Sequence, residues 1–151
     1  MLKIFTIGKK HESWITPGLD RYEKRLTKPW NLEWGLLPHS SLEGVRARQE
    51  ESERLFARLG SDDFVILLDE RGKNLSSPAL SETIAAQLDH SRQVMFIIGG
   101  AYGVDEKLTE RANLIWSLSN LVFPHQLVRL ILAEQLYRAQ EIAAGRPYHH
   151  E

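Results

Sequence analysis

The sequence contains no cysteine among its 151 residues. This absence excludes a disulfide framework, thiolate catalysis and any cysteine-based zinc site. The chain also lacks an apolar run close to the ~20 residues that a membrane-spanning helix needs. No internal repeat, low-complexity stretch or linker interrupts it, and its length suits a single folding unit. We therefore expect residues 1–151 to form one domain that has no membrane association.

Two common phosphate-binding motifs are absent as well. No glycine-rich segment ends in Gly-Lys-Ser or Gly-Lys-Thr, which excludes a P-loop. The segment Gly99-Gly100-Ala101-Tyr102-Gly103 does not have the spacing G-x-G-x-x-G. It also follows a late strand, whereas the motif of a dinucleotide-binding fold follows the first strand. A nicotinamide-dependent oxidoreductase is therefore poorly supported.

Positive charge is not in excess, since the chain has 19 Lys and Arg residues and 20 Asp and Glu residues, which gives a formal net charge of −1. Binding of nucleic acid by bulk counterion release should then be weak. Two local basic clusters remain, Arg21-Lys24-Arg25-Lys28 and Arg46-Arg48. Each is either a phosphate-contacting patch or the solvated face of a helix. The N-terminus has no signal-peptide layout, so we expect a cytoplasmic protein.

Strand and helix patterns alternate along the whole chain. Their order predicts a single α/β domain, with a mostly parallel sheet and helices on both of its faces. We expect strands over 2–7, 32–37, 64–68 and 94–98, a further apolar run over 114–118, and helices over 14–26, 42–59, 77–88, 105–112 and 125–144. The third of these helices should begin with Ser77 as N-cap and Pro78 at its first position.

Two of the buried strands end in loops that could line a ligand site. Leu68 precedes a polar loop, and Gly99 and Gly100 follow the strand at residues 94–98. In open α/β sheets, ligands bind outside the carboxyl ends of the strands, and glycines let the backbone approach a ligand closely. The alternatives are that these glycines only form a tight turn and that Leu68 only packs in the core.

The helix expected over 125–144 is apolar around most of its circumference. One stripe consists of Val128, Leu132, Leu136, Ala139 and Ala143. A second apolar face continues into Glu134 and Arg138, which are spaced to form an ion pair. Such a helix is either central to the core or packed against a partner subunit. His125 and Arg129 lie one turn apart, either near a substrate or as a helix cap and a surface arginine.

The chain ends in Tyr148-His149-His150-Glu151, directly after the helix-breaking Gly145-Arg146-Pro147. The tail cannot continue the preceding helix and must pack elsewhere or stay mobile. Adjacent histidines on an extended segment point in opposite directions and rarely bind one ion together, so we predict no metal site.

Several segments together resemble the RlmH-type methyltransferases, which are members of the SPOUT class. The resemblance covers the whole chain in order and spacing. It is carried by the strand at residues 2–8 followed by Lys9, by Tyr22-Glu23-Lys24-Arg25-Leu26, Phe96-Ile97-Ile98-Gly99-Gly100, Phe123-Pro124-His125-Gln126-Leu127-Val128-Arg129, Glu134-Gln135-Leu136-Tyr137-Arg138-Ala139 and Pro147-Tyr148-His149. The family implies a SPOUT-type domain with a C-terminal trefoil knot.

The resemblance also implies an activity. That family transfers a methyl group from S-adenosylmethionine to the N3 nitrogen of a pseudouridine in 23S large-subunit ribosomal RNA, and it favours a homodimer that acts within the assembled ribosome. The implied cofactor-binding residues are Leu68, Gly99, Gly100, Leu118, Ser119, Asn120, Leu121, Val122 and Phe123. The implied catalytic residues are His149, Tyr148 and Arg138, with His125, Arg129 and His150 near the substrate. The family often has Arg or Lys where this chain has His150.

The residues by themselves leave one further class open. A non-enzymatic α/β binding module, such as a ribosome-associated factor, would have the same strand and helix pattern. Binding of adenosylmethionine, tested against NADH, would separate the methyltransferase, the binding module and the oxidoreductase.

Overall fold

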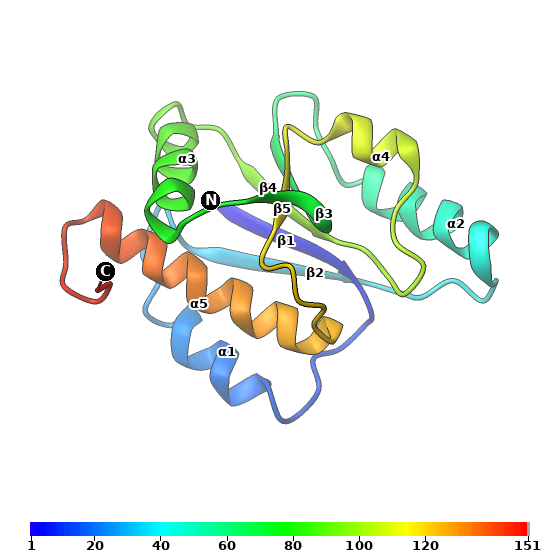
Figure 1. Ribbon diagram of the computed structural model, residues 1–151, viewed down its shortest axis with the longest axis horizontal. Coiled ribbons are helices and arrows are strands. Elements are labelled where there is room, and N and C mark those ends of the chain that lie inside the picture. The colour runs from blue at the N-terminus through cyan, green and yellow to red at the C-terminus, as the bar shows by residue number, and fades with distance from the viewer. Residues whose placement is uncertain (151) are drawn as a thin grey trace.

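A computed structural model describes residues 1–150 of the chain. Five strands alternate with five helices along the sequence (Figure 1). The elements are β1 (Leu2–Ile7), α1 (Thr16–Glu23), β2 (Leu32–Leu37), α2 (Gly44–Phe56), β3 (Phe64–Asn74), α3 (Ser77–Asp89), β4 (Val94–Ile98), α4 (Glu106–Arg111), β5 (Leu114–Ser117) and α5 (His125–Ala143).

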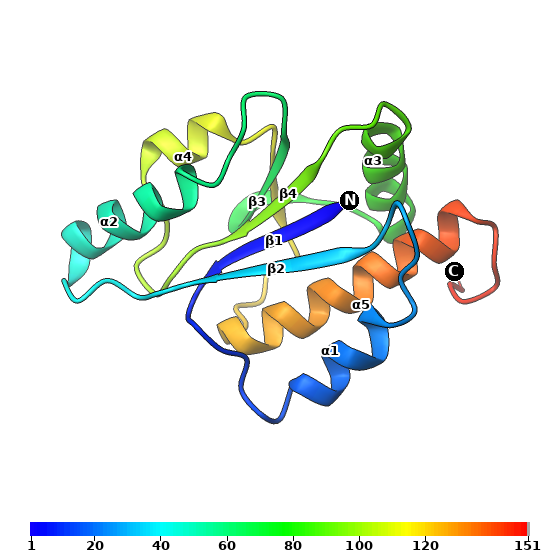
Figure 2. The same ribbon diagram turned by 180° about the vertical axis from the view of Figure 1, so that it is seen from behind.

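All five strands form one sheet in the order β2-β1-β4-β3-β5, and every neighbouring pair is parallel (Figure 2). β4 lies in the middle, between β1 and β3, and all five of its residues are buried. This confirms the prediction of a single α/β domain with a mostly parallel sheet. Because the strands are parallel, their carboxyl ends meet at one edge of the sheet.

Helices cover both faces of the sheet, as predicted. On one face, the main core includes Ile66 and Phe96 from the strands, with Ile84 of α3 and Leu136 of α5. On the other face, Leu67 and its neighbours pack against α2 and α4. Side chains that alternate along β3 therefore enter opposite cores, which is why this strand appears in the sequence as a continuous apolar run.

Local capping explains where two helices begin. The hydroxyl of Ser76 accepts a hydrogen bond from the backbone N–H of Ala79. Ser76 is therefore the N-cap of α3 and Ser77 is already helical, which corrects the predicted cap by one residue. Asp105 caps α4 in the same way by accepting from Leu108 N. α1 and α2 are each shorter than the apolar pattern suggested.

β3 is longer than predicted. It continues past Leu68 to Asn74, and its pairing with β5 shifts between Leu68 and Lys73. Residues 69–72 are thereby displaced from the ladder. Their position next to β5 is close-packed, since a Cβ on Gly72 would lie 2.6 Å from the carbonyl oxygen of Ile115.

α5 belongs to the core of its own chain. It packs against α1 and α3 (Figure 1), and Leu132, Leu136 and Ala139 are fully buried. The predicted apolar stripe thus faces the sheet. None of the helices within residues 1–150 has the length and apolar character required to cross a membrane.

Candidate cofactor cleft and C-terminal tail

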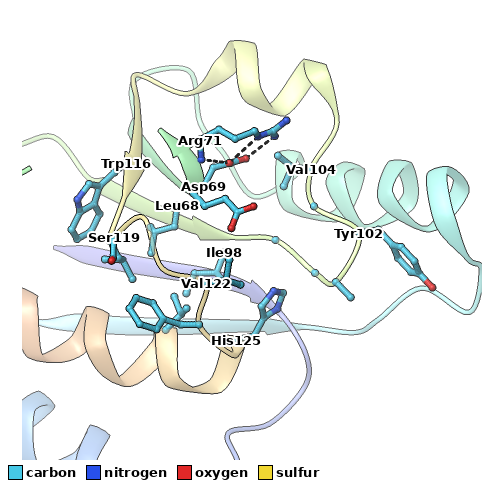
Figure 3. A pocket seen from close by; sticks show the side chains of 18 of the residues that line it. Leu68, Asp69, Arg71, Ile98, Tyr102, Val104, Trp116, Ser119, Val122 and His125 are labelled. Atoms are coloured by element: carbon cyan, nitrogen blue, oxygen red, sulfur yellow. Dashed lines mark hydrogen bonds and ion pairs between the residues drawn. The ribbon is translucent and has the colours of Figure 1, made fainter. Parts of the chain in front are cut away.

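A cleft of about 550 Å³ opens at the carboxyl ends of β3, β4 and β5, beside the first turn of α5 (Figure 3). Three loops that are far apart in the sequence meet there. Its lining includes Arg48, Leu68, Asp69, Glu70, Arg71, Ile98, Gly99, Gly100, Ala101, Tyr102, Gly103, Val104, Trp116, Leu118, Ser119, Leu121, Val122, Phe123, His125 and Val128.

The structure therefore brings together eight of the nine residues predicted to contact a cofactor; Asn120 is the one that is not part of the lining. The alternative in which Leu68 and Leu118 serve only the core does not account for their position at this cleft. The side chains of Leu121 and Val122 are 68% and 77% exposed, respectively. Such exposure is unusual for adjacent apolar residues and marks the mouth of the cleft as a contact surface.

The two glycines are needed by the packing of their own turn. A Cβ on Gly99 would lie 2.8 Å from Cγ1 of Val104, and a Cβ on Gly100 would collide with the Glu51 carboxylate. A side chain added at either glycine would therefore clash within the turn, and its effect would not be limited to occupying space in the cleft. The tight-turn alternative is supported by these contacts, and both glycines also line the cleft.

An ion pair at the rim was not predicted. The guanidinium of Arg71 donates from Nε and Nη2 to the two carboxylate oxygens of Asp69, at 3.0 and 2.8 Å. These hydrogen bonds lower the pKa of Asp69, outweighing its partial burial. The polar loop after β3 indicated a site, but the pairing depends on the displacement of residues 69–72 from the sheet, which no sequence pattern revealed.

His125 lines the cleft as the first residue of α5. Desolvation, followed by repulsion from the Arg129 guanidinium, lowers its pKa from the ordinary value of 6.5. The imidazole is therefore neutral near neutral pH. It can donate one hydrogen bond and accept another, but it carries no charge to attract a phosphate.

Arg129 is 1% exposed, so the alternative of a surface arginine is wrong. Its Nη2 donates to the carbonyl oxygens of Ile7 and Gly8 at 3.2 and 3.3 Å, and its Nη1 donates to Lys10 O at 2.9 Å. The guanidinium thus holds the backbone that leaves β1. Any effect of Arg129 on a substrate would be exerted through that loop.

The three predicted catalytic residues lie together at the other end of α5. Arg138 Nη1 donates to Nδ1 of His149 at 3.1 Å, and the Arg138 guanidinium carbon lies 4.8 Å from the centre of the Tyr148 ring. Glu134 accepts from Arg138 Nε at 2.9 Å, which confirms the predicted pair. Burial, followed by the Glu134 charge, raises the pKa of Tyr148. His150 is exposed, and Glu151 lies outside the described residues.

The tail does not cover the cleft of its own chain. Arg138 follows His125 by 13 residues along α5, which corresponds to ~20 Å at the α-helical rise of about 1.5 Å per residue. Residues 148–150 are absent from the cleft lining, and the segment that follows α5 lies at the opposite end of this helix from its first turn (Figure 1). The version of the prediction in which the tail folds over its own cleft is therefore wrong.

Among residues 1–150, no group of three or more histidine and acidic side chains is arranged to hold a metal ion. In particular, His149 contacts an arginine, whereas His39 lies near Glu51 on another part of the molecule.

Comparison with known proteins identifies the family. A family model described as "Predicted SPOUT methyltransferase" matches residues 1–149. A protein of Geotalea daltonii is 40% identical over 151 residues, covering 99% of both chains. A protein of Pelotomaculum thermopropionicum is 41% identical over 157 residues, covering 99% of this chain and 98% of the relative. Both relatives are named "Ribosomal RNA large subunit methyltransferase H". On this evidence, the chain belongs to the SPOUT methyltransferase family.

Proposed function

We propose that this protein transfers a methyl group from S-adenosylmethionine to the N3 nitrogen of a pseudouridine in 23S large-subunit ribosomal RNA. The observation that carries the proposal is the convergence on one cleft of three segments, namely residues 68–71 in the displaced part of β3, the loop after β4 and the loop after β5. Membership of the SPOUT methyltransferase family and the names of the full-length relatives support the same reaction.

The cleft fits adenosylmethionine in its chemistry. Leu118, Leu121 and Val122 offer an apolar wall for a purine ring, and the backbone of Gly99 and Gly100 offers hydrogen-bonding groups for its edge. The charged side chains of the lining are balanced, because Arg71 pairs with Asp69 and Arg48 offsets Glu70, so they do not by themselves attract a cationic group. Bound adenosylmethionine supplies a methyl carbon that is already activated by positive sulfur.

The residues of the tail suit the task of orienting a uracil ring. Tyr148 keeps its phenolic proton at neutral pH, because its pKa is raised, and it can donate to a carbonyl oxygen of the base. Arg138 has no lone pair to offer, so Nδ1 of His149 must be the acceptor in their contact. A neutral His149 then carries its proton on Nε2. Nε2 is buried in this geometry, so we propose that His149 holds Arg138 in position and that water takes the N3 proton.

We further propose that the active protein is a homodimer in which each cleft receives the tail of the partner subunit. The ~20 Å between the first turn of α5 and Arg138 separates the cleft from the tail within one chain. A two-fold axis that pairs the α5 helices in opposite directions would bring one tail to the other cleft. The exposed Leu121 and Val122 would then be covered.

The trefoil knot of the family is also part of the proposal. Its support is that β5 ends at one edge of the sheet while α5, which follows directly, packs between α1 and α3. The backbone trace of a crystal structure would test it.

We propose the assembled ribosome as the substrate and the cytoplasm as the location. With a net charge of −1, free RNA should be bound weakly, and a structured ribosomal target would supply the missing affinity. Methylation assays with intact ribosomes, isolated large subunits and free 23S RNA would test this order of preference.

The decisive experiment removes the tail. Deletion of residues 148–151 should lower the methylation rate on ribosomes by about a hundredfold or more, while calorimetry shows unchanged binding of adenosylmethionine and none of NADH. His149→Ala should show a similar loss, and His90→Ala, at an exposed histidine on the C-cap of α3, serves as the matched control. Full activity of the tail-deleted protein would overturn the assignment of the tail.

A further inference from the structure

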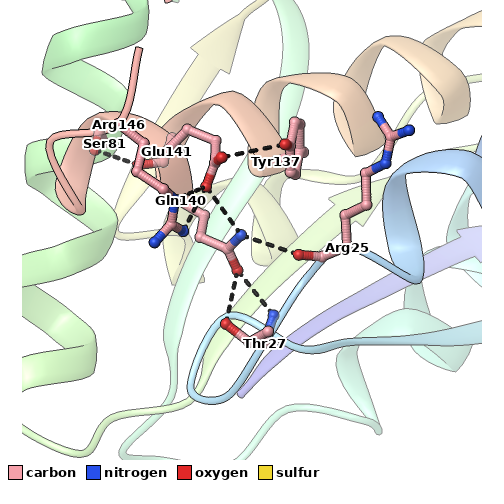
Figure 4. Close-up of polar contacts among 8 residues, drawn as sticks. Arg25, Thr27, Ser81, Tyr137, Gln140, Glu141 and Arg146 are labelled. Carbon is pink, nitrogen blue, oxygen red and sulfur yellow. Dashed lines mark hydrogen bonds and ion pairs between the residues drawn. The ribbon is translucent and has the colours of Figure 1, made fainter. Parts of the chain in front are cut away.

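Two polar residues are buried at the C-terminal end of α5. Gln140 is 4% exposed and Glu141 is 8% exposed. Gln140 Oε1 accepts from the backbone N–H of Thr27 at 2.8 Å, and its Nε2 donates to the carbonyl oxygen of Arg25 at 3.1 Å (Figure 4). A single side chain thus satisfies both a donor and an acceptor of the segment that follows α1.

Glu141 occupies the next position and fastens the chain beyond α5. Its Oε2 accepts from Nε of Arg146 at 2.8 Å, and its Oε1 accepts from the Tyr137 hydroxyl at 3.1 Å. The hydrogen bond from Arg146 lowers the pKa of Glu141. Gln140 and Glu141 together connect the segment after α1, the last turns of α5 and the start of the tail.

Aromatic contacts make the same connection. The Tyr22 ring of α1 lies 6.0 Å from that of Tyr137, and the Tyr137 ring lies 4.8 Å from that of Tyr148. These distances are in the range of favourable aromatic pairs. The tail is therefore packed against a unit that includes the basic segment, residues 21–28.

The basic segment has an uncompensated positive charge. Arg21, Lys24, Arg25 and Lys28 are exposed, and none of them forms an ion pair with an acid in the part of the chain that the structure describes. Asp20 lies next to Arg21 and is also exposed, whereas the other acids around the segment have other partners. Glu23 accepts from the Trp34 indole, Glu134 pairs with Arg138, and Glu141 pairs with Arg146.

We propose that the basic segment, residues 21–28, is a phosphate-contacting surface for the ribosomal RNA strand that flanks the target nucleotide. Gln140 is a positioning residue that keeps this surface in register with Tyr148 and His149. In a protein of net charge −1, a local cluster of this kind provides the electrostatic contact that the whole chain lacks. The inference rests on the proposed function.

The test compares two double variants that remove the same charge. Lys24→Gln/Lys28→Gln changes the basic segment, and Arg58→Gln/Lys107→Gln changes exposed residues just after α2 and on α4. Binding of intact ribosomes and of free 23S RNA is measured between about 50 and 300 mM salt. The first variant should reduce the slope of log affinity against log salt by roughly 2, about one for each phosphate that is no longer neutralised. The second should leave the slope unchanged.

Two outcomes would overturn the inference. Equal slopes in the two variants would show that the basic segment is only a solvated face. A loss of affinity for ribosomes alone, with 23S RNA unaffected, would assign the surface to a ribosomal protein. If the wild-type protein methylates no RNA at all, the proposed function fails. The slopes still report separately on the surface.

The role of Gln140 needs a readout beyond stability. Gln140→Met keeps the volume and all the cations but removes both hydrogen bonds to the basic segment. The KM for ribosomes should rise about tenfold, because the basic segment is no longer held in a fixed position relative to the tail. The salt slope should stay that of the wild type, because the same number of phosphates is neutralised. An unchanged KM in a folded Gln140→Met protein would contradict the positioning role.

Discussion

Arg129 illustrates how a charged side chain can be buried without an acid beside it. Three backbone carbonyl oxygens, from Ile7, Gly8 and Lys10, accept from its Nη1 and Nη2, whereas its buried Nε has no hydrogen-bond partner in the described part of the chain. Gly8 makes this possible, since its φ of +121° suits a glycine and a Cβ there would lie 2.8 Å from Nη2. The sequence could not predict this burial, because the partners are main-chain atoms 119 to 122 positions away.

The two histidines near Arg129 predict a pH dependence of stability. Desolvation, followed by repulsion from Arg129, lowers the pKa values of His11 and His125 below 6.5. The unfolded chain therefore binds more protons than the folded protein just below that pH. The free energy of unfolding should fall as the pH drops from about 7.5 to 5.5, above the range in which carboxylates titrate.

Urea denaturation at these two pH values measures the effect. The variant His11→Gln/His125→Gln should lose stability less steeply over this interval, because its two titrating groups are gone. His90→Gln, at an exposed histidine on the C-cap of α3, is the matched control. An identical pH slope in all three proteins would contradict the prediction.

Gly99 predicts a clash that a second mutation should relieve. In Gly99→Ala, the new Cβ meets Cγ1 of Val104 and should displace the turn, weakening adenosylmethionine binding by at least about tenfold, or ~1.4 kcal/mol. The double variant Gly99→Ala/Val104→Ala removes the contacted methyl group and should recover most of the affinity in calorimetry. No recovery would indicate that the alanine obstructs the cleft itself.

At the scale of elements, the strongest patterns gave the most accurate bounds. β1, β2 and β4 begin and end where their apolar runs do. The meeting of three loops at one cleft could also be predicted, since it follows from parallel strands. The extension of β3 to Asn74 could not, because residues 69–74 are polar and pair with β5 only after a shift in register.

Burial distinguishes two apolar faces of α5. Leu132, on the predicted stripe, is fully buried within the chain, so an aspartate there would unfold the protein and could not test assembly. Leu127 and Ile131 are only partly buried and lie outside the three hydrophobic clusters of the described chain. We propose that these two side chains belong to the face that contacts a partner subunit.

Ile131→Asp should therefore convert a dimer into a folded monomer. The charged side chain would have to be desolvated at the contact, which costs several kcal/mol. Sedimentation at micromolar concentration measures the mass, and circular dichroism checks the fold. Val45→Asp, at a 57% exposed position on α2, is the control and should remain a dimer. A wild-type monomer would contradict the proposed assembly.

At the scale of the whole molecule, the separation of tail and cleft predicts complementation between subunits. A Gly99→Val chain lacks a working cleft but keeps its tail, and a chain without residues 148–151 has the opposite defect. Each homodimer should be inactive. Random pairing after co-expression makes half of the dimers mixed, each with one intact site, so roughly a quarter of the wild-type activity should return.

The readout is methylation of intact ribosomes by the co-expressed pair. A single chain that carries both changes, mixed with itself, is the control and should stay inactive. Failure of the mixed pair to regain activity, although mixed dimers are recovered, would mean that the tail acts on a cleft of its own chain.

The burial of Arg129 also determines when the molecule can become native during synthesis. The backbone that leaves the first strand finds its hydrogen-bond donor only in the last helix, and that helix supplies Leu132, Leu136 and Ala139 to the main core. A nascent chain that ends before α5 has neither this hydrogen-bond donor nor these three core side chains. Stable folding therefore has to wait until α5 has left the exit tunnel, so the earlier segments remain accessible to chaperones and proteases until then.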